Sequence, residues 1–172
     1  MEVRVRPETP ADEAAIREIN MQAFGRPEEA RLVDAVRASE AYIPELSLVA
    51  ECEGRLVGHI LFSRGTVEGE GEPVELLALG PLAVRPECQR QGVGGQLVRA
   101  GLERAAALGY RAVFLIGHPT YYPRFGFVPG RRLSLKSTCD VLDDVFMALP
   151  LRPDALDGVR GTVVYAPAFA EV

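Results

Sequence analysis

The turn from Gln89 to Gly95, with the sequence QRQGVGG, has the composition of an anion-binding site. An apolar strand pattern precedes it from Leu76, and an amphipathic helical pattern follows it as far as Leu108. A glycine-rich turn at the start of a helix presents backbone N–H groups that have no helical partner, at the positive end of the helix dipole. The sequence therefore predicts a phosphate-bearing ligand here; a tight turn whose glycines only permit close packing is the alternative.

Two common phosphate-binding motifs do not fit this turn. A P-loop requires lysine and then serine or threonine after its last glycine, whereas Gly95 is followed by Gln96 and Leu97. A dinucleotide-binding unit has an acidic residue at the end of the strand after the helix, whereas that strand here ends in the segment Ile116–Pro119 (IGHP). Other residues must therefore identify the phosphate carrier.

The predicted strand Val74–Arg85 is interrupted at Gly80-Pro81. Pro81 has no backbone N–H and Gly80 permits unusual backbone angles, so we expect the hydrogen-bonded ladder to break there. A broken ladder leaves the backbone donors and acceptors of Leu82 and Val84 free. An extended chain of amides can then pair with them as an added strand would. An ordinary bulge in an edge strand is the alternative.

Residues 82–95 (LAVRPECQRQGVGG) resemble the central motif of the GNAT superfamily of N-acetyltransferases, in which an apolar strand and a Gln/Arg-x-x-Gly-x-Gly/Ala turn bind acetyl-coenzyme A (acetyl-CoA). The segment Tyr121–Phe127 (YYPRFGF) is similar to the family's aromatic-Tyr-x-x-x-Gly-Phe segment, and the order of predicted elements matches over nearly the whole chain. The resemblance implies that acetyl-CoA is the co-substrate, with its pyrophosphate on the N–H groups of residues 90–95 and its pantetheine arm along residues 82–84. The cofactor-binding residues predicted in this way are Leu82, Ala83, Val84, Gln89, Arg90, Gln91, Gly92, Val93, Gly94 and Gly95.

Acetyl transfer to an amine sets three requirements for such a site. An alkyl amine with a pKa of about 10 must lose a proton, the oxyanion of the tetrahedral intermediate needs an N–H donor, and the departing thiolate needs a proton. The free N–H of Leu82 or Val84 is our candidate oxyanion donor. Tyr122 matches the family's tyrosine, so the resemblance implies that it is the general acid; an aromatic residue that only packs in the core is the alternative.

The general base has several candidates. Glu75 lies on the long predicted strand, from which family members often draw a glutamate or a glutamate-held water; a surface glutamate is the alternative. His118 follows a predicted strand close to Tyr122, and it either lines the acceptor pocket or caps the end of the strand. His59, inside another predicted strand, is interpreted as a core histidine. Uptake of the neutral amine through water would need no side-chain base.

One segment departs from the family pattern. In many members, an asparagine that contacts the cofactor lies shortly before the tyrosine. Here residues 117–120 (GHPT) lead directly into Tyr121 and contain no asparagine. Pro123 follows the predicted general acid, so any helix at this point must be short. The asparagine contact is therefore not predicted for this chain.

The composition favours one domain and excludes several classes of protein. With 172 residues, 48% of them apolar, the chain is long enough for one sizeable core, and we predict a single N-acetyltransferase domain over residues 1–172. The net charge of −5 argues against nucleic acid as a partner. No apolar run approaches the roughly 20 residues of a membrane span, so no membrane association is expected. Three widely spaced cysteines and two histidines form no metal-binding pattern, so we expect free thiols, no metal site and a cytoplasmic protein.

The predicted elements place these residues in an α/β (α+β) fold. A cap at Thr9 begins one helix, Pro27 begins another, and a third runs from Gly92 to Leu108, where Gly109 ends it. The predicted strands cover Val3–Val5, Ser47–Cys52, Arg55–Ser63, Val74–Arg85, Ala112–Ile116, Val145–Leu151 and Gly161–Tyr165, with a loop over Gly65–Pro73. This order indicates a single GNAT-like domain with a mixed, mostly antiparallel sheet flanked by helices and a splayed central strand pair.

We therefore predict an acetyl-CoA-dependent N-acetyltransferase whose acceptor is the primary amine of a small molecule or a peptide. A catalytically silent module that senses acyl-CoA is the alternative, because no single side chain stands out as the base. The acceptor pocket is expected between the loops around Gly25, Ala38–Pro44 and Lys136–Asp144. Pairing of exposed strands could form a homodimer.

Overall fold

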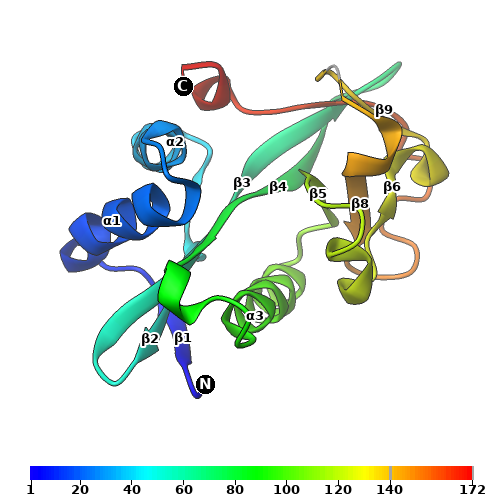
Figure 1. Ribbon diagram of the computed structural model, residues 1–172. Helices are drawn as coiled ribbons and strands as arrows, with labels where there is room; N and C mark the ends of the chain where they lie inside the picture. Colours follow the sequence, from blue (N-terminus) through cyan, green and yellow to red (C-terminus); the bar gives the residue numbers. More distant parts are fainter. Residues whose placement is uncertain (140, 172) are drawn as a thin grey trace.

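The computed structural model of the protein describes residues 1–139 and 141–171, in which a mixed sheet is flanked by helices (Figure 1). The α-helices of these residues are α1 (Glu13–Phe24), α2 (Glu28–Arg37) and α3 (Val93–Ala107). The strands are β1 (Arg4–Pro7), β2 (Tyr42–Cys52), β3 (Arg55–Glu68), β4 (Val74–Val84), β5 (Ala112–Ile116), β6 (Val128–Pro129), β7 (Leu135–Ser137), β8 (Phe146–Pro150) and β9 (Gly161–Val164). Three short 3-10 turns also contribute residues to the cleft described below: η2 (Pro86–Cys88), η3 (Tyr122–Phe125) and η6 (Pro167–Glu171). Residues 140 and 172 of the predicted domain lie outside the described residues.

The sheet opens between two central strands. Its order is β1-β2-β3-β4-β5-β8-β6, and every neighbouring pair on this path is antiparallel except β4–β5. The parallel pair β4–β5 is joined only at Leu77–Val113 and Ala78–Phe114. Beyond Ala78 the two strands separate, so the splayed central pair predicted from the sequence is confirmed (Figure 1).

The helices begin and end at residues that favour those positions. The Thr9 N–H donates to Asp12 Oδ2 (2.7 Å) just before α1, which is one half of a capping box. Gly25 follows α1 with a φ of +67°, and Gly109 follows α3 with a φ of +90°, both in the left-handed region that glycine adopts without strain. Pro27 directly precedes α2. The helix limits predicted at Thr9, Pro27 and Gly109 are therefore confirmed.

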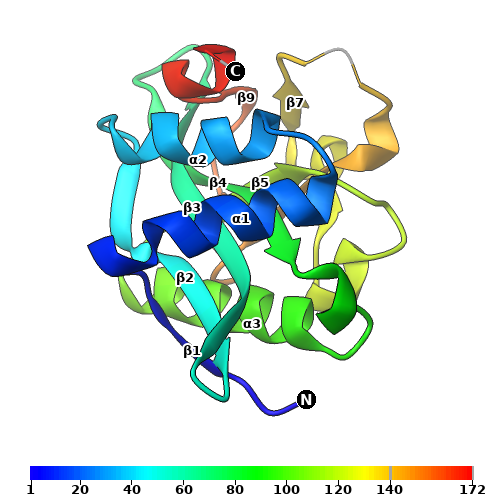
Figure 2. The same ribbon diagram turned by 60° about the vertical axis from the view of Figure 1, so that its left-hand side comes forward.

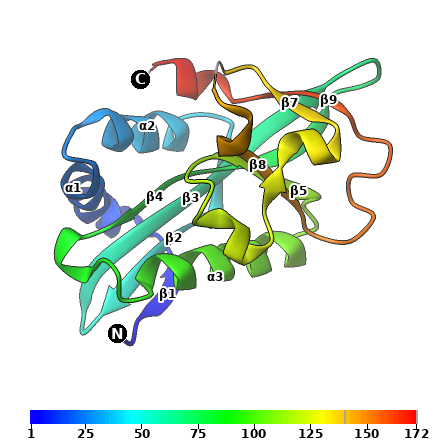
Figure 3. The same ribbon diagram turned by 45° about the vertical axis from the view of Figure 1, so that its right-hand side comes forward.

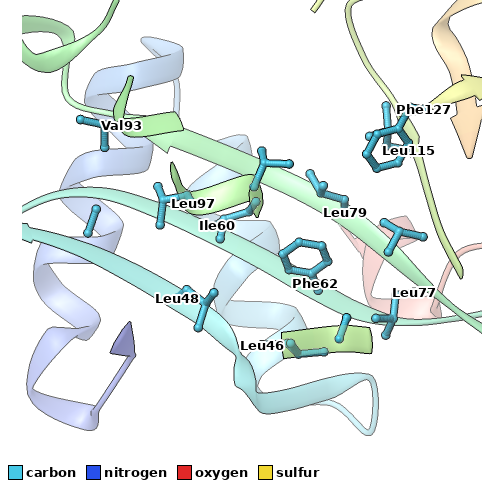
Figure 4. Packing of buried hydrophobic residues seen from close by; sticks show 14 of the residues in the cluster. Leu46, Leu48, Ile60, Phe62, Leu77, Leu79, Val93, Leu97, Leu115 and Phe127 are labelled. Atoms are coloured by element: carbon cyan, nitrogen blue, oxygen red, sulfur yellow. The ribbon is translucent and has the colours of Figure 1, made fainter. Parts of the chain in front are cut away.

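The helices lie on opposite faces of the sheet. Helices α1 and α2 cover one face, and the C-terminal turn η6 lies beside α2 (Figure 2). Helix α3 covers the other face, as Figure 3 shows from a different side. Leu97 of α3 belongs to the same buried cluster as Ile60 and Phe62 of β3 (Figure 4). A Cβ on Gly101 would lie 2.1 Å from the Phe62 ring, so only glycine lets α3 approach the sheet this closely.

Three features of the sheet differ from the sequence prediction. Strand β3 continues to Glu68, through the first part of the predicted Gly65–Pro73 loop, because it pairs there with both β4 and β9. Gly65 belongs to the strand for a packing reason: a Cβ there would lie 2.7 Å from the Phe114 ring. Strand β2 begins at Tyr42 instead of Ser47. Strands β6 and β7, of 2 and 3 residues, were not predicted because such short strands carry no periodic pattern.

A group of buried polar side chains fixes α1 and α2 to the sheet. His59 of β3 is fully buried, with Nε2 3.0 Å from Ser47 Oγ and Nδ1 3.5 Å from the Asn20 amide nitrogen of α1. Glu8 accepts a hydrogen bond from Ser47 and pairs with Arg37 of α2 (Nη2–Oε2 2.9 Å). Burial lowers the pKa of His59, although the Glu8 carboxylate opposes this shift. His59 is therefore a core histidine, as the sequence predicted.

The described residues bear on membrane association, metal binding and the state of the cysteines. Within residues 1–139 and 141–171 no helix is long and apolar enough to cross a membrane. The same residues contain no group of three or more His, Cys, Asp or Glu side chains arranged to hold a metal ion. Cys52, Cys88 and Cys139 are free thiols.

Candidate functional site

The opening between β4 and β5 forms a cleft of about 1440 Å³. We define its two halves by the residues that line them. The strand half is lined by residues of 79–99 and 116–125, which belong to β4, the start of α3, the end of β5 and η3. The helix half is lined by residues of 23–32, 138–139 and 164–170, which belong to α1, α2, the segment after β7 and the C-terminal segment. Because α3 and the α1–α2 pair cover opposite faces, the cleft passes through the sheet.

The interruption at Gly80-Pro81 is a bulge and not a break in the pairing of β4 with β3. The register of the β3–β4 pair shifts between Ile60 and Phe62, and pairing resumes at Leu82. We expected the broken ladder itself to free the backbone after Pro81. The structure frees it differently, because β5 has already separated from β4 on the other side.

The free edge of β4 carries the backbone groups of Leu82 and Val84. The Arg85 N–H donates to Val57 O of β3 (2.8 Å). Backbone groups of alternate residues on a strand point in the same direction, so Ala83 also faces β3, whereas Leu82 and Val84 face the cleft. The arrangement leaves the N–H groups of these two residues available to a ligand.

The turn before α3 presents a row of unpaired N–H groups. Arg90 and Gly92 adopt φ angles of +62° and +87°, which turn the chain sharply into the helix. The first hydrogen bond of α3 runs from the Gln96 N–H to Gly92 O (3.1 Å). Among the described residues, the N–H groups of residues 90–95 have no acceptor within the protein. This is the geometry that binds an anion at a helix N-terminus.

The two glutamines of the turn hold main-chain oxygens. Gln89 Nε2 donates to Val84 O (3.0 Å), and Gln91 Nε2 donates to Glu87 O (3.1 Å). The first of these bonds ties the turn to β4 and occupies the Val84 carbonyl. Gln89 lines the cleft, whereas Gln91 does not, so the side chain of Gln91 acts by supporting the turn.

Three arginines add positive charge to the strand half, and of these only Arg90 was predicted from the sequence. Arg90, Arg99 and Arg124 all line the cleft. The Arg99 guanidinium lies over the Phe125 ring at 5.1 Å, and the Arg124 guanidinium lies over the Tyr121 ring at 4.5 Å. Arg99 was detectable as a residue two turns into the helix after the glycine motif, but its direction depends on the packing of η3 against α3.

The adjacent tyrosines of η3 take different positions. The Tyr122 ring packs against Gly117, where a Cβ would lie 2.6 Å from the ring. Burial and the neighbouring Tyr121 raise the pKa of Tyr122 to about 12. The Tyr121 hydroxyl lies 3.1 Å from the position of a Cβ on Gly94, in the gap between α3 and β4. Both tyrosines line the cleft, and η3 is a single short turn, as the sequence predicted from Pro123.

The structure separates the two predicted base candidates. His118 is exposed and lines the cleft, and its carbonyl oxygen accepts the Tyr121 N–H (3.2 Å) in the turn that follows β5. Glu75 is exposed and forms an ion pair with Arg64 (Nε–Oε1 3.6 Å). Glu75 is not among the residues that line the cleft, so the structure does not bring it to Tyr122 or His118.

The helix half was only partly anticipated. The loop around Gly25 and the segment 136–144 contribute Phe24, Thr138 and Cys139, with residue 140 outside the described residues. The predicted loop 38–44 contributes none of the lining residues. The segment 164–170 was missed, because the signal of its turn η6 is weak and its position beside α2 depends on long-range packing.

This fold and cleft match one family. A family model described as the acetyltransferase (GNAT) domain matches residues 4–130, more than half of the chain. The N-acetyltransferase YhbS of Escherichia coli (strain K12) is 35% identical over 166 residues, which cover 96% of this chain and 97% of that protein. The chain therefore belongs to the GNAT family of acetyltransferases, as predicted from its two motifs.

Further relatives and solved structures agree with this assignment. YjhQ of the same E. coli strain, named an uncharacterized N-acetyltransferase as YhbS also is, is 49% identical over 119 residues, which cover 69% of this chain and 66% of YjhQ, just under two thirds of its length. The crystal structure of E. coli YhbS in complex with CoA superposes with a TM-score of 0.91 at 33% identity, covering 99% of this chain and 93% of that chain. A GNAT family acetyltransferase from Brucella melitensis in complex with acetyl-CoA gives a TM-score of 0.79 at 35% identity, with 98% of each chain covered.

Proposed function

We propose that this protein transfers an acetyl group from acetyl-CoA directly to the primary amine of a small molecule or a peptide. The observation that carries the proposal is a single cleft lined by three features. These are the N–H groups of residues 90–95, the free edge of β4 and the side chain of Tyr122. The relatives in complex with CoA and acetyl-CoA support this choice of co-substrate. Membership of a family of acetyltransferases favours acetyl transfer over the alternative of a catalytically silent acyl-CoA sensor.

The two sets of main-chain groups suit different parts of acetyl-CoA. The unpaired N–H groups of residues 90–95 would bind the pyrophosphate, with the positive end of the α3 dipole and Arg99 adding to the attraction. The amides of the pantetheine arm would pair with the free edge of β4 at Leu82 and Val84, as an added strand does. The arm would then deliver its thioester to the opening between β4 and β5.

The N–H of Leu82 or Val84 is proposed to stabilise the oxyanion. Attack of the amine nitrogen on the thioester carbonyl forms the C–N bond and places a negative charge on the carbonyl oxygen. A fixed N–H donor at that position stabilises the charge without reorganisation during the reaction. The Val84 carbonyl is already bonded to Gln89, which holds the strand in place for this role.

Tyr122 is proposed to protonate the departing sulfur. Its raised pKa of about 12 keeps the phenol protonated at neutral pH. A thiol has a pKa of about 8.5, so proton transfer from this phenol to the thiolate alone would be unfavourable. The attacking nitrogen becomes acidic once it has added to the carbonyl. Passage of its proton to the phenol, as the phenol gives its own proton to sulfur, keeps Tyr122 neutral while the C–S bond breaks.

The amine must first lose the proton that it carries in water. Among the predicted base candidates, His118 lines the cleft close in sequence to Tyr122, and it is the side chain that we propose for this step, directly or through water. Glu75 is not retained in this role, because it is paired with Arg64 outside the cleft.

Calorimetric titration tests the basis of this proposal. We expect acetyl-CoA to bind with one site per chain, and acetyl-pantetheine, which lacks the pyrophosphate and nucleotide, to bind far more weakly. Release of CoA thiol in the presence of a panel of amines then measures transfer. Absence of acetyl-CoA binding at millimolar concentration would refute the proposed function.

A further inference from the structure

The helix half of the cleft has an apolar wall assembled from three separate segments. Ala23, Leu32 and Phe169 pack against the buried cluster between the sheet and helices α1 and α2. Phe169 also packs against a second cluster, together with Tyr165. We define the apolar wall as the cleft-lining residues Ala23, Phe24, Leu32, Tyr165 and Phe169. It lies in the same cleft as the free edge of β4, so a molecule bound there can reach the thioester.

Three aromatic side chains of the wall, Phe24, Tyr165 and Phe169, are placed to hold a planar apolar ligand. The Tyr165 and Phe169 rings lie 4.6 Å apart, and Tyr165 is fixed edge-on against the buried Phe114 (5.1 Å). Phe24, the last residue of α1, keeps 39% of its surface exposed while it lines the cleft. Apolar surface left in water inside a cleft favours a ligand that covers it.

The charges of the helix half do not suit a polycation. Among its described lining residues, Glu29 is the only carboxylate. Both oxygens of Glu29 are bonded to Arg26, with an Nε–Oε1 distance of 2.9 Å. A polyamine or an aminoglycoside carries several ammonium groups and needs several unpaired carboxylates, because a buried charge without a partner is costly.

We propose that the acceptor is a primary alkylamine whose chain bears an aromatic ring or a hydrocarbon group of similar size, with that group against Phe24, Leu32 and Phe169. This inference rests on the proposed acetyl transfer and names its acceptor class. The amine nitrogen bonds to the acetyl carbon, the C–S bond of acetyl-CoA breaks, and one amine proton ends on the CoA sulfur. The products are an N-acetyl arylalkylamine or alkylamine and free CoA.

Three amines test the inference in the thiol-release assay. 2-Phenylethylamine has the ring, n-propylamine has the same primary amine without it, and spermidine is a polycation. We expect kcat/KM for 2-phenylethylamine to exceed that for n-propylamine by about 10- to 100-fold, the effect of burying a phenyl group. Spermidine should be no better than n-propylamine. Equal values for the two monoamines, or preference for spermidine, would overturn the inference.

Two substitutions on α1 provide a matched pair. Phe24→Ala should lower kcat/KM for 2-phenylethylamine about fivefold and leave n-propylamine and acetyl-CoA affinity unchanged, because Phe24 supplies only part of the wall. Met21 lies one turn earlier on α1, is similarly exposed at 45% and does not line the cleft. Met21→Ala should therefore leave kcat/KM for both monoamines and the affinity for acetyl-CoA unchanged. An equal loss for both monoamines in Phe24→Ala would contradict a contact with the ring.

Direct binding separates this inference from the proposed function. We expect 2-phenylethylamine to bind the CoA-loaded protein in a calorimetric titration, and Phe24→Ala to weaken that binding. If acetyl-CoA binds and no amine is acetylated, this titration still decides the acceptor class. Absence of 2-phenylethylamine binding would then overturn the inference. If acetyl-CoA does not bind, the proposed function fails, and the same titration on the protein alone decides whether the wall takes the amine.

Discussion

The two halves of the cleft offer a ligand different kinds of chemical group. The strand half offers main-chain groups from one short stretch, the edge of β4 at residues 82–84 and the turn at 90–95. The helix half offers side chains from residues 23–32, 138–139 and 164–170, which are far apart in the chain. Main-chain recognition depends on backbone shape and open space, whereas side-chain recognition depends on which residues occupy the wall. Changes in the two halves should therefore alter different measured quantities.

The largest effect should come from filling the gap between α3 and β4. Gly94→Leu places a side chain among the Tyr121 hydroxyl, Leu82 and Val84, where the pantetheine arm is proposed to pass. We expect acetyl-CoA affinity to fall by more than about 100-fold, or about 2.7 kcal/mol, in a calorimetric titration. Leucine favours helix more than glycine does, so the fold should persist.

Gly94→Ala is the control for this block. Its Cβ would lie 3.1 Å from the Tyr121 hydroxyl, the end of a flexible side chain that can move by a few tenths of an ångström. Affinity should therefore change little. Equal binding of acetyl-CoA by Gly94→Leu and the unaltered protein would show that the ligand does not pass between α3 and β4.

Tyr122→Phe separates chemistry from binding in the strand half. Loss of the proton donor should lower kcat by about 100-fold, the lower end of the range for general acid catalysis, with the affinity for acetyl-CoA unchanged. Because the pKa of Tyr122 is about 12, its ionisation should not reduce kcat of the unaltered protein until the pH approaches that value. Steady-state rates at saturating amine measure both effects.

Tyr121→Phe provides the comparison for this substitution. Its hydroxyl lies in the gap beside Gly94, so its removal should affect acetyl-CoA binding more than kcat. A Tyr122→Phe protein that turns over at the original rate would reject the role of Tyr122 as general acid.

The arginines should have a smaller and salt-dependent effect. Arg99→Gln combined with Arg124→Gln should weaken acetyl-CoA binding by about tenfold at low salt, since exposed charge pairs contribute about 0.2–1 kcal/mol each. The difference should shrink as salt is added, because salt screens exposed charges. Arg104→Gln, on the same helix as Arg99 but outside the cleft, should have no effect. An effect that does not depend on salt would argue against charge attraction.

The smallest expected effect is the pH dependence of folding stability that comes from His59, which helps to fix α1 and α2 to the sheet. His59 has a pKa below its ordinary value of 6.5, so the unfolded chain binds more protons than the folded protein as the pH falls below 6.5. The stability contribution of neutral His59 is therefore complete above pH 6.5 and is lost progressively below it. Urea unfolding at pH 7.5 and 5.5 should give a lower free energy of unfolding at pH 5.5.

The other histidine supplies the control for this pH dependence. His59→Gln should reduce the difference between the two pH values, whereas substitution of the exposed His118 by glutamine should leave it unchanged. If the unaltered protein and both variants show the same pH dependence of the free energy of unfolding, protonation of His59 does not affect the packing of α1 and α2 on the sheet.

Local patterns were sufficient for much of the fold and of the strand half. Thr9, Pro27 and Gly109 marked the helix limits because caps act over a few residues. The row of unpaired N–H groups at residues 90–95 was predicted for the same reason, since such groups follow from a helix start. The wrong prediction for residues 65–68 has the opposite origin: Gly65 reads as a turn residue, but contact with Phe114 and pairing with β9 keep it in β3. The candidate base Glu75 could not be judged from the chain, because its distance from the cleft depends on the direction of β4.

The order of residues by itself determined the family, the helix-start turn and the tyrosine-bearing segment, because each depends on contiguous residues and short-range geometry. Only the tertiary structure decided that β5, and not a break in β3–β4 pairing, exposes the edge of β4. It also brought Phe24, Leu32 and Phe169 to one wall. The first arrangement depends on pairing between strands whose partners lie 36 positions apart (Leu77 and Val113). The second depends on packing between residues more than one hundred positions apart, and no local pattern encodes either distance.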